Sequence, residues 1–172
     1  MSGERFFHDY FGTVAEKLND IDPESLVQAA TMVRRTHGSG NKVILAGNGG
    51  SAAMASHVAV DLTKAAGIRA MNFNEADLLT CLANDYGYEN WVAKALEFYA
   101  DPGDLVILIS SSGASQNMVN GAEQASAMGL AVVSLSGFSP DNPLRRLGDL
   151  NLWVASDSYN IVEMTHHVWL LA

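Results

Sequence analysis

The sequence predicts an α/β fold, an open parallel sheet of about five strands with helices on both faces. Short apolar runs such as residues 104–109 alternate along the chain with longer segments of helical periodicity. These runs are apolar throughout, which is typical of parallel strands that are buried on both faces. Their alternation with helices therefore indicates a sheet covered on both sides.

Two helices are predicted before the first strand, over residues 4–18 and 23–37. The first has a wide stripe of aromatic and apolar side chains at helical spacing. Such a stripe packs either on the core of its own subunit or on a helix of another subunit. The second helix starts at Asp22 and Pro23, because Asp is a preferred N-cap and Pro fits the first helical position. The Gly-Ser-Gly sequence at 38–40 ends it.

A unit of strand, turn and helix then occurs twice. A strand over 42–46 leads through a glycine-rich turn into a helix over 51–64, and a strand over 104–109 leads through a serine-rich turn into a helix over 114–128. Further strands are predicted at 68–73, 130–135 and 150–154, and further helices at 75–83, 89–99 and 160–172. Because no linker or low-complexity stretch interrupts this order, we expect residues 1–172 to form a single domain.

The composition limits the classes of partner. The 172 residues include 19 acidic and 10 basic ones, a formal net charge of -9, which argues against direct binding to DNA or RNA. No apolar stretch approaches the roughly 20 residues of a membrane helix, and the N-terminus lacks the pattern of a signal peptide. The single cysteine, Cys81, has no partner for an internal disulfide. We therefore expect a cytoplasmic protein without membrane contact.

Two turns have the residue types of a phosphate site, and we call them the glycine loop (residues 47–51) and the seryl loop (residues 110–115). In open parallel sheets, ligands bind beyond the carboxyl ends of the strands where the order of connection reverses, so the two turns can converge on one crevice. In the glycine loop, Asn48 can bond a sugar hydroxyl and Ser51 begins a helix, whose backbone N-H groups can hold a phosphate without positive charge.

A small phosphorylated ligand fits these loops better than a nucleotide. Neither turn is followed by the Gly-Lys-Ser/Thr of a P-loop, and no acidic residue ends a second strand near position 70 as a dinucleotide site requires. The sequence therefore predicts a sugar phosphate as ligand and no nucleotide cofactor.

Four ordered segments, at 47–62, 79–88, 109–119 and 159–167, resemble the sugar isomerase (SIS) family, most closely its branch that isomerises sedoheptulose 7-phosphate. The resemblance implies a flavodoxin-like sheet and a homotetramer that packs through the N-terminal helices of residues 1–38. It also implies active sites that neighbouring subunits complete. The substrate contacts that it implies are Asn48, Gly49, Gly50, Asn84, Asp85, Ser110, Ser111, Ser112 and Ser115, to which we add Ser51 from its place at the helix start.

In that branch a carbonyl moves between C1 and C2 through an enediol, an intramolecular oxidoreduction that needs a base at carbon and an acid at oxygen. The resemblance places the family's His and Glu of the first motif, four residues apart on one helical face, at His57 and Asp61. It implies Asp61 as the base and both residues as ligands of zinc. Asp61 is one methylene shorter than the family's Glu.

The last helix departs from the family. In gapless register, its Gln and its catalytic His fall on Val162 and Leu170, which cannot bind zinc or transfer a proton. The sequence has Glu163, His166 and His167 instead, and Glu163 with either histidine can form an acid/base or metal pair one helical turn apart.

Three functions follow from these residues. The first is an aldose-ketose isomerase that converts sedoheptulose 7-phosphate in heptose precursor synthesis, with Asp61 as the base. The alternative is a non-catalytic phosphosugar-binding module that acts through protein contacts and resembles the DnaA initiator-associating protein, which the missing Gln and His favour. A third is an isomerase of a different sugar phosphate with a rewired acid. Structural interpretations also remain open, with His57 as a core histidine and Asp61 as a local ion-pair partner.

Overall fold

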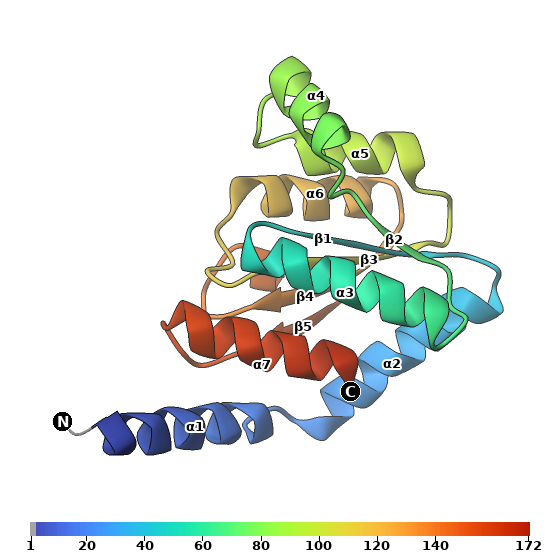
Figure 1. Cartoon of the computed structure of the whole chain (residues 1–172). Helices are drawn as coiled ribbons and strands as arrows, with labels where there is room; N and C mark the ends of the chain where they lie inside the picture. Colours follow the sequence, from blue (N-terminus) through green and yellow to red (C-terminus); the bar gives the residue numbers. More distant parts are fainter. Residues whose placement is uncertain (1–2) are drawn as a thin grey trace.

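The computed structural model describes residues 3–172, which form a five-stranded parallel sheet in the order β2-β1-β3-β4-β5 (Figure 1). The strands are β1 (Val43–Gly47), β2 (Ala70–Asn72), β3 (Leu105–Ser110), β4 (Ala131–Ser136) and β5 (Leu150–Trp153). The prediction of an open parallel sheet is confirmed. The edge strand β2 is shorter than predicted, because it pairs with β1 at three positions and has no strand on its other side.

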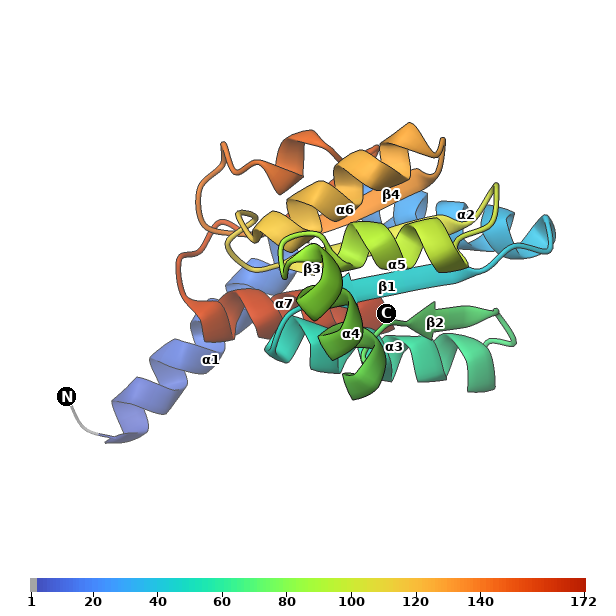
Figure 2. The ribbon, with the colours of Figure 1, turned by 90° about the horizontal axis from the view of Figure 1, so that it is seen from above.

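Helices cover both faces of the sheet, as predicted. They are α1 (Gly3–Asn19), α2 (Pro23–Gly38), α3 (Gly50–Lys64), α4 (Ala76–Tyr86), α5 (Trp91–Tyr99), α6 (Gln116–Ala127) and α7 (Tyr159–Leu171), with a 3-10 turn, η1 (Leu144–Arg146), that the sequence did not predict. In Figures 1 and 2, α5 and α6 lie on one face and α3 and α7 on the other, with α4 outside α5.

Two apolar layers explain why the strands are apolar throughout. Leu105, Ile107 and Ile109 of β3 pack in the layer beneath α2, α3 and α7. The alternate residues Val106 and Leu108 pack in the layer beneath α5 and α6. Successive side chains of a strand point to opposite faces, so a strand with helices on both sides needs an apolar residue at every position.

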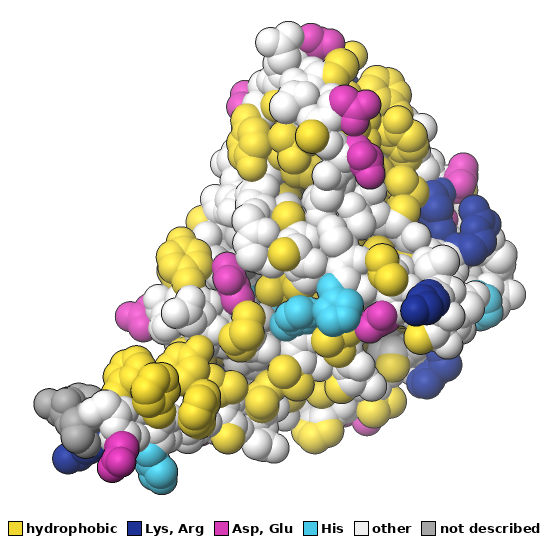
Figure 3. All heavy atoms as spheres, in the orientation of Figure 1, with side chains coloured by type: hydrophobic (Ala, Val, Ile, Leu, Met, Phe, Trp, Pro, Cys, Tyr) yellow, Lys and Arg dark blue, Asp and Glu magenta, His cyan; other side chains and the backbone are white. Residues whose placement is uncertain are grey.

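The helix α1 extends away from the sheet, and its aromatic side chains lie on the surface (Figure 3). Phe6, Phe7 and Phe11 are each more than half exposed, and within residues 3–19 none is buried. The end of α1 is held to α7, where the indole N-H of Trp169 donates to the carbonyl of Leu18 at 3.1 Å. Within the described chain the aromatic rings of α1 therefore contact one another and solvent, and only the end of the stripe, at Leu18, packs against the core.

Within residues 3–172, none of the helices combines the length and the apolar character that a membrane crossing requires.

Candidate functional site

The order of connection reverses between β1 and β3. The chain passes from β1 to β2 on one side, and β3 lies on the other side of β1. The turns that follow β1 and β3 therefore diverge and leave a crevice at the carboxyl edge of the sheet. These turns are the glycine loop and the seryl loop.

Both loops line one cleft of about 260 Å³. Its lining residues are Asn48, Gly49, Gly50, Ser51, Ile109, Ser110, Ser111, Ser112, Ser115, Tyr159 and Glu163. The prediction that the two loops meet at one sheet edge is confirmed, because Ser51 and Ser112 share this cleft.

A larger cavity of about 720 Å³ lies between α2, α3, α7 and the sheet. Its lining is apolar apart from the side chains of Arg34 and Asp61. Because it offers almost no group that could bind or transform a polar ligand, the smaller cleft is the candidate site despite its size.

The glycine loop passes from β1 into α3 through only two residues, Asn48 and Gly49. Gly49 has φ of 54°, a conformation that side chains other than glycine rarely adopt. A Cβ on Gly50 would collide with the carboxylate of Glu163 on α7. The loop therefore lets backbone form this wall of the cleft.

The seryl loop ends β3 and begins α6. Ser110 and Ser111 are buried, and the hydroxyl of Ser110 donates to that of Ser115 at 3.0 Å. Ser115 is the N-cap residue of α6, yet no side chain caps this helix. The first turn of α6 contains no acidic residue, so the electrostatic character of this helix end favours an anion.

The hydroxyl of Ser111 is buried and has no hydrogen-bond partner among the described residues. A buried polar group without a partner costs about 1–3 kcal/mol. Ser111 lines the cleft, so its hydroxyl is free to bond a ligand there.

Two residues of α7 form the opposite wall, Tyr159 and Glu163. Among the described residues that line the cleft, Glu163 is the only carboxylate, and none is Lys or Arg. The cleft can thus bind a phosphate through hydroxyl and N-H groups and still present a carboxylate to the rest of the ligand.

The predicted pair His57 and Asp61 lies outside the cleft in this chain. At about 1.5 Å per residue, the two are about 10 and 16 Å along α3 from Gly50. His57 Nδ1 is 3.0 Å from His167 Nε2, and His57 Nε2 is 3.4 Å from Asp61 Oδ2. This row of side chains lies on the surface between α3 and α7, where Figure 3 shows histidine side chains grouped together.

The prediction that His166 takes part in an acid/base or metal pair is wrong, because His166 is a core residue. Its side chain is 0% exposed and its Nε2 bonds to the carbonyl of Ser136 at 3.1 Å. Burial lowers the pKa of His166 to about 4, against a smaller opposing effect of the Ser136 carbonyl. Position 166 faces the sheet while 163 and 167 face α3, so His166 cannot serve as the acid in the cleft.

Asn84 and Asp85 are not brought to the cleft either. Both are exposed on α4, where the amide of Asn84 donates to Asp85 at 2.9 Å. The second segment, 79–88, reaches the site through Tyr88, whose hydroxyl donates to Asn48 Oδ1 at 3.1 Å. Tyr88 was not among the predicted site residues, although it ends the same segment as Asn84 and Asp85.

Tyr159 and Asn117 were also not among the predicted site residues. Tyr159 precedes Glu163 by four residues, so helical spacing alone places both on one face. Asn117 follows the seryl loop by two residues and is buried. The sequence shows only that this asparagine stands on the first turn of a predicted helix beside a ligand loop, whereas its burial is known from the structure alone.

The side chains do not fit the zinc that the resemblance implies. Among residues 3–172, no group of three or more His, Cys, Asp and Glu is arranged to hold a metal ion. His57 directs opposite ring nitrogens to His167 and to Asp61, so the three cannot converge on one ion. Zinc in proteins takes three or four protein ligands. Here His57 Nδ1 and His167 Nε2, at 3.0 Å, point at each other rather than at a common ion.

The sequence and the fold of this chain were compared with those of known proteins, and the matches below belong to one family. Residues 7–137 match the model of the SIS domain. The phosphoheptose isomerase of Akkermansia muciniphila is 33% identical over 164 residues, 92% of this chain and 84% of that protein. That of Campylobacter concisus is 37% identical over 162 residues, 90% and 83% of the two chains. The structure of phosphoheptose isomerase from Neisseria gonorrhoeae superposes with a TM-score of 0.88 at 25% identity, over 98% of this chain and 94% of that one.

Proposed function

The chain belongs to the SIS domain family, and on that premise we propose that it is an aldose-ketose isomerase that converts sedoheptulose 7-phosphate into an aldoheptose 7-phosphate. The observation that supports this function is the cleft shared by the glycine and seryl loops, in which the hydroxyl of Ser111 lacks a partner. The relatives reported above are named phosphoheptose isomerases and match most of this chain. The non-catalytic binding module is therefore not favoured, and the product is a precursor for heptose synthesis.

The phosphate group binds at the seryl loop. The hydroxyls of Ser111 and Ser112 and the N-terminal turn of α6 act as donors to its oxygens. Without Lys or Arg among the described lining residues, binding depends on directed hydrogen bonds rather than on net charge.

The carbon skeleton then extends from the seryl loop toward Gly50 and Glu163. The Glu163 carboxylate removes the proton from the hydroxyl-bearing carbon, C1 of the ketose, and the electrons of that C-H bond form the C1-C2 double bond. The oxygen on C2 then takes the proton of the C1 hydroxyl, which gives the anion of the enediol with its charge on the C1 oxygen. Glu163 returns the carbon-bound proton to C2, and the C1 oxygen, which has already given its proton to the C2 oxygen, becomes the carbonyl of the aldehyde. One carboxylate can serve both steps, because the two carbons are adjacent.

Asp61, His57 and His167 take no step within a single chain. They form an exposed row that a neighbouring subunit would meet in the homotetramer that the resemblance implies. The exposed aromatic face of α1 is the surface for that assembly, since contiguous apolar patches of this kind mark interaction sites. Because the side chains do not fit zinc, we derive no step through a metal.

A direct assay tests the function. Purified protein is incubated with sedoheptulose 7-phosphate, with and without zinc, while formation of the aldose is followed and thermal stabilisation by the sugar phosphate is measured. We expect both turnover and stabilisation. Glu163→Gln should keep the stabilisation and lose turnover by about 100-fold or more.

Two outcomes would refute parts of the proposal. Stabilisation of the unmodified protein without turnover would refute the isomerase and support the binding module. Full turnover in Glu163→Gln together with its loss in Asp61→Asn would move the base to the row on α3.

A further inference from the structure

A pair of reciprocal hydrogen bonds joins the two ligand loops. The side-chain amide of Asn48 donates to Asn117 Oδ1 at 3.0 Å, and the amide of Asn117 donates to Asn48 Oδ1 at 2.8 Å. Asn48 belongs to the glycine loop, and Asn117 lies on the first turn of α6, directly after the seryl loop. Asn117 is 2% exposed and does not line the cleft, so it reaches a ligand through Asn48 alone.

The Asn48–Asn117 pair lies just beyond the point where the backbone hydrogen bonds between β1 and β3 end. The pairing of β1 with β3 ends at Gly47 and Ile109, the last residues in register. Beyond these residues the two turns enter helices on opposite faces of the sheet, α3 on one face and α6 on the other. A cross-link between side chains at this point therefore sets the separation of the two loops.

Tyr88 adds a third element to the pair. Its hydroxyl donates to Asn48 Oδ1 at 3.1 Å from the segment between α4 and α5. The oxygen of Asn48 thus accepts from both Tyr88 and Asn117, and one N-H of its amide is left for a ligand or for water. The orientation of the Asn48 amide is consequently set by two residues that do not carry substrate contacts themselves.

We propose that Asn117 is a positioning residue, which through Asn48 fixes the distance between the glycine loop and the seryl loop, with Tyr88 as a secondary anchor. The inference rests on the proposed function, since a sugar phosphate spans both loops with its phosphate at one and its reacting carbons at the other. A misplacement of about 1 Å between the two can cost about 100-fold in rate. Inorganic phosphate occupies the seryl loop alone and is insensitive to this distance.

The test compares Asn117→Ala with Asn120→Ala. Asn120 lies one turn further along α6 and also bonds to a distant segment, to the Glu89 carbonyl and to Asn90, both at 2.9 Å. Asn120→Ala thus removes an asparagine of the same helix and its bonds to a distant segment, as Asn117→Ala does, but the side chain of Asn120 makes no hydrogen bond to the described residues that line the cleft. For each variant we measure kcat, KM, competition by inorganic phosphate, and thermal unfolding.

We expect Asn117→Ala to lower kcat/KM at least tenfold, with a change of less than threefold in the inhibition constant of inorganic phosphate. Asn120→Ala should retain kcat/KM within twofold. Asn48→Ala combined with Asn117→Ala should be no worse than Asn48→Ala alone, because the two residues act as one unit. Tyr88→Phe, which removes one hydroxyl, should give a smaller loss of about threefold.

Three results would overturn the inference. They are an equal loss of phosphate binding and of turnover in Asn117→Ala, additive losses in the double variant, and a loss no larger than that of Asn120→Ala. If the unmodified protein shows no turnover, the proposed function fails by itself. The positioning of the loops is then tested by the shift in melting temperature that each ligand causes. Asn117→Ala must weaken the stabilisation by sedoheptulose 7-phosphate but not that by inorganic phosphate. An equal weakening for both ligands overturns the inference.

Discussion

The carboxylate of Glu163 on α7 lies directly against Gly50, the first residue of α3. A Cβ at position 50 would collide with the carboxylate, which is the mobile end of the side chain. The width of the cleft at this point thus depends on two features. Gly50 has no side chain on one wall, and the side chain of Glu163 extends from the other.

Gly50→Ala should therefore displace the proposed proton-transferring group. The added methyl forces the Glu163 carboxylate aside, and we expect kcat to fall at least tenfold. The free energy of unfolding should change by about 1 kcal/mol or less, because a flexible side chain yields more easily than a packed core. Gly38→Ala is the matched control, since its Cβ meets nothing within 4 Å. Unchanged kcat in Gly50→Ala would contradict the placement of Glu163.

Ser111→Ala should separate ligand binding from stability. The Ser111 hydroxyl has no partner among the described residues, so its removal should leave the melting temperature unchanged or slightly raised. In the proposed complex this hydroxyl donates to the phosphate, so KM of the variant should rise about tenfold. Ser136→Ala is the contrasting variant, because the Ser136 hydroxyl accepts from Asn142 and Asn151, both at 3.2 Å. That variant should lose about 1 kcal/mol of stability with KM unchanged, and the reverse pattern would contradict both assignments.

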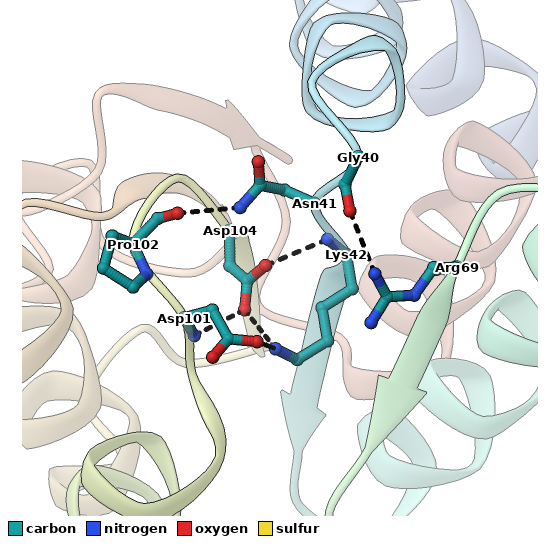
Figure 4. A network of polar contacts seen from close by, with 7 residues as sticks. All are labelled: Gly40, Asn41, Lys42, Arg69, Asp101, Pro102 and Asp104. Carbon is teal, nitrogen blue, oxygen red and sulfur yellow. Dashed lines mark hydrogen bonds and ion pairs between the residues drawn. The ribbon is translucent and has the colours of Figure 1, made fainter.

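The opposite edge of the sheet contains a buried ion pair whose loss should affect stability alone (Figure 4). Asp104 is 1% exposed, and its carboxylate forms an ion pair with the ammonium of Lys42. It also accepts hydrogen bonds from two backbone N-H groups, that of Lys42 at 2.9 Å and that of Asp101 at 2.8 Å. Burial by itself would raise the pKa of Asp104, but these partners hold it below its ordinary value.

Asp104→Asn leaves the Lys42 ammonium beside a neutral amide, and we expect a loss of about 3 kcal/mol in the free energy of unfolding. Asp101 also pairs with Lys42, at 2.6 Å, but its side chain is 71% exposed. Asp101→Asn should therefore cost less than about 1 kcal/mol. Denaturant unfolding of the two variants measures the difference, and kcat/KM of both should match the unmodified protein. Equal losses of stability would mean that burial of Asp104 is not what makes its pair important.

The strands and the α-helices were predictable because each of them has a local signal, which the 3-10 turn η1 lacks. The N-cap at Asp22 is observed as a hydrogen bond from the Glu24 N-H at 3.1 Å, and both loops begin helices within two residues of the predicted position. The cleft was predictable from the fold, because parallel strands place their carboxyl ends at one edge.

The side chains that complete the site were less predictable. Whether a residue on α7 faces the cleft or the core depends on a rotation of about 100° per residue, and gapless register with a family cannot fix that rotation. Glu163 reaches the cleft, whereas His166, three residues later, faces β4 and bonds to Ser136. The pairing of Asn48 with Asn117 joins residues 69 positions apart, and no local pattern announces such a contact.

His166 should make the stability of the protein depend on pH in the weakly acid range. Its pKa in the folded chain is about 4, below the ordinary 6.5, so the unfolded chain binds a proton first as the pH falls. The contribution of neutral His166 is fully present above pH 6.5 and is lost as the pH falls toward 4, with about 2 kcal/mol lost between pH 7 and pH 5. His166→Gln keeps a donor for the Ser136 carbonyl but cannot titrate, so its free energy of unfolding should vary less over this interval. His37→Gln, at an exposed position, should keep the slope of the unmodified protein. Urea unfolding at pH 7, 6 and 5 measures the three slopes, and a slope in His166→Gln as steep as that of the unmodified protein would show that another group is responsible.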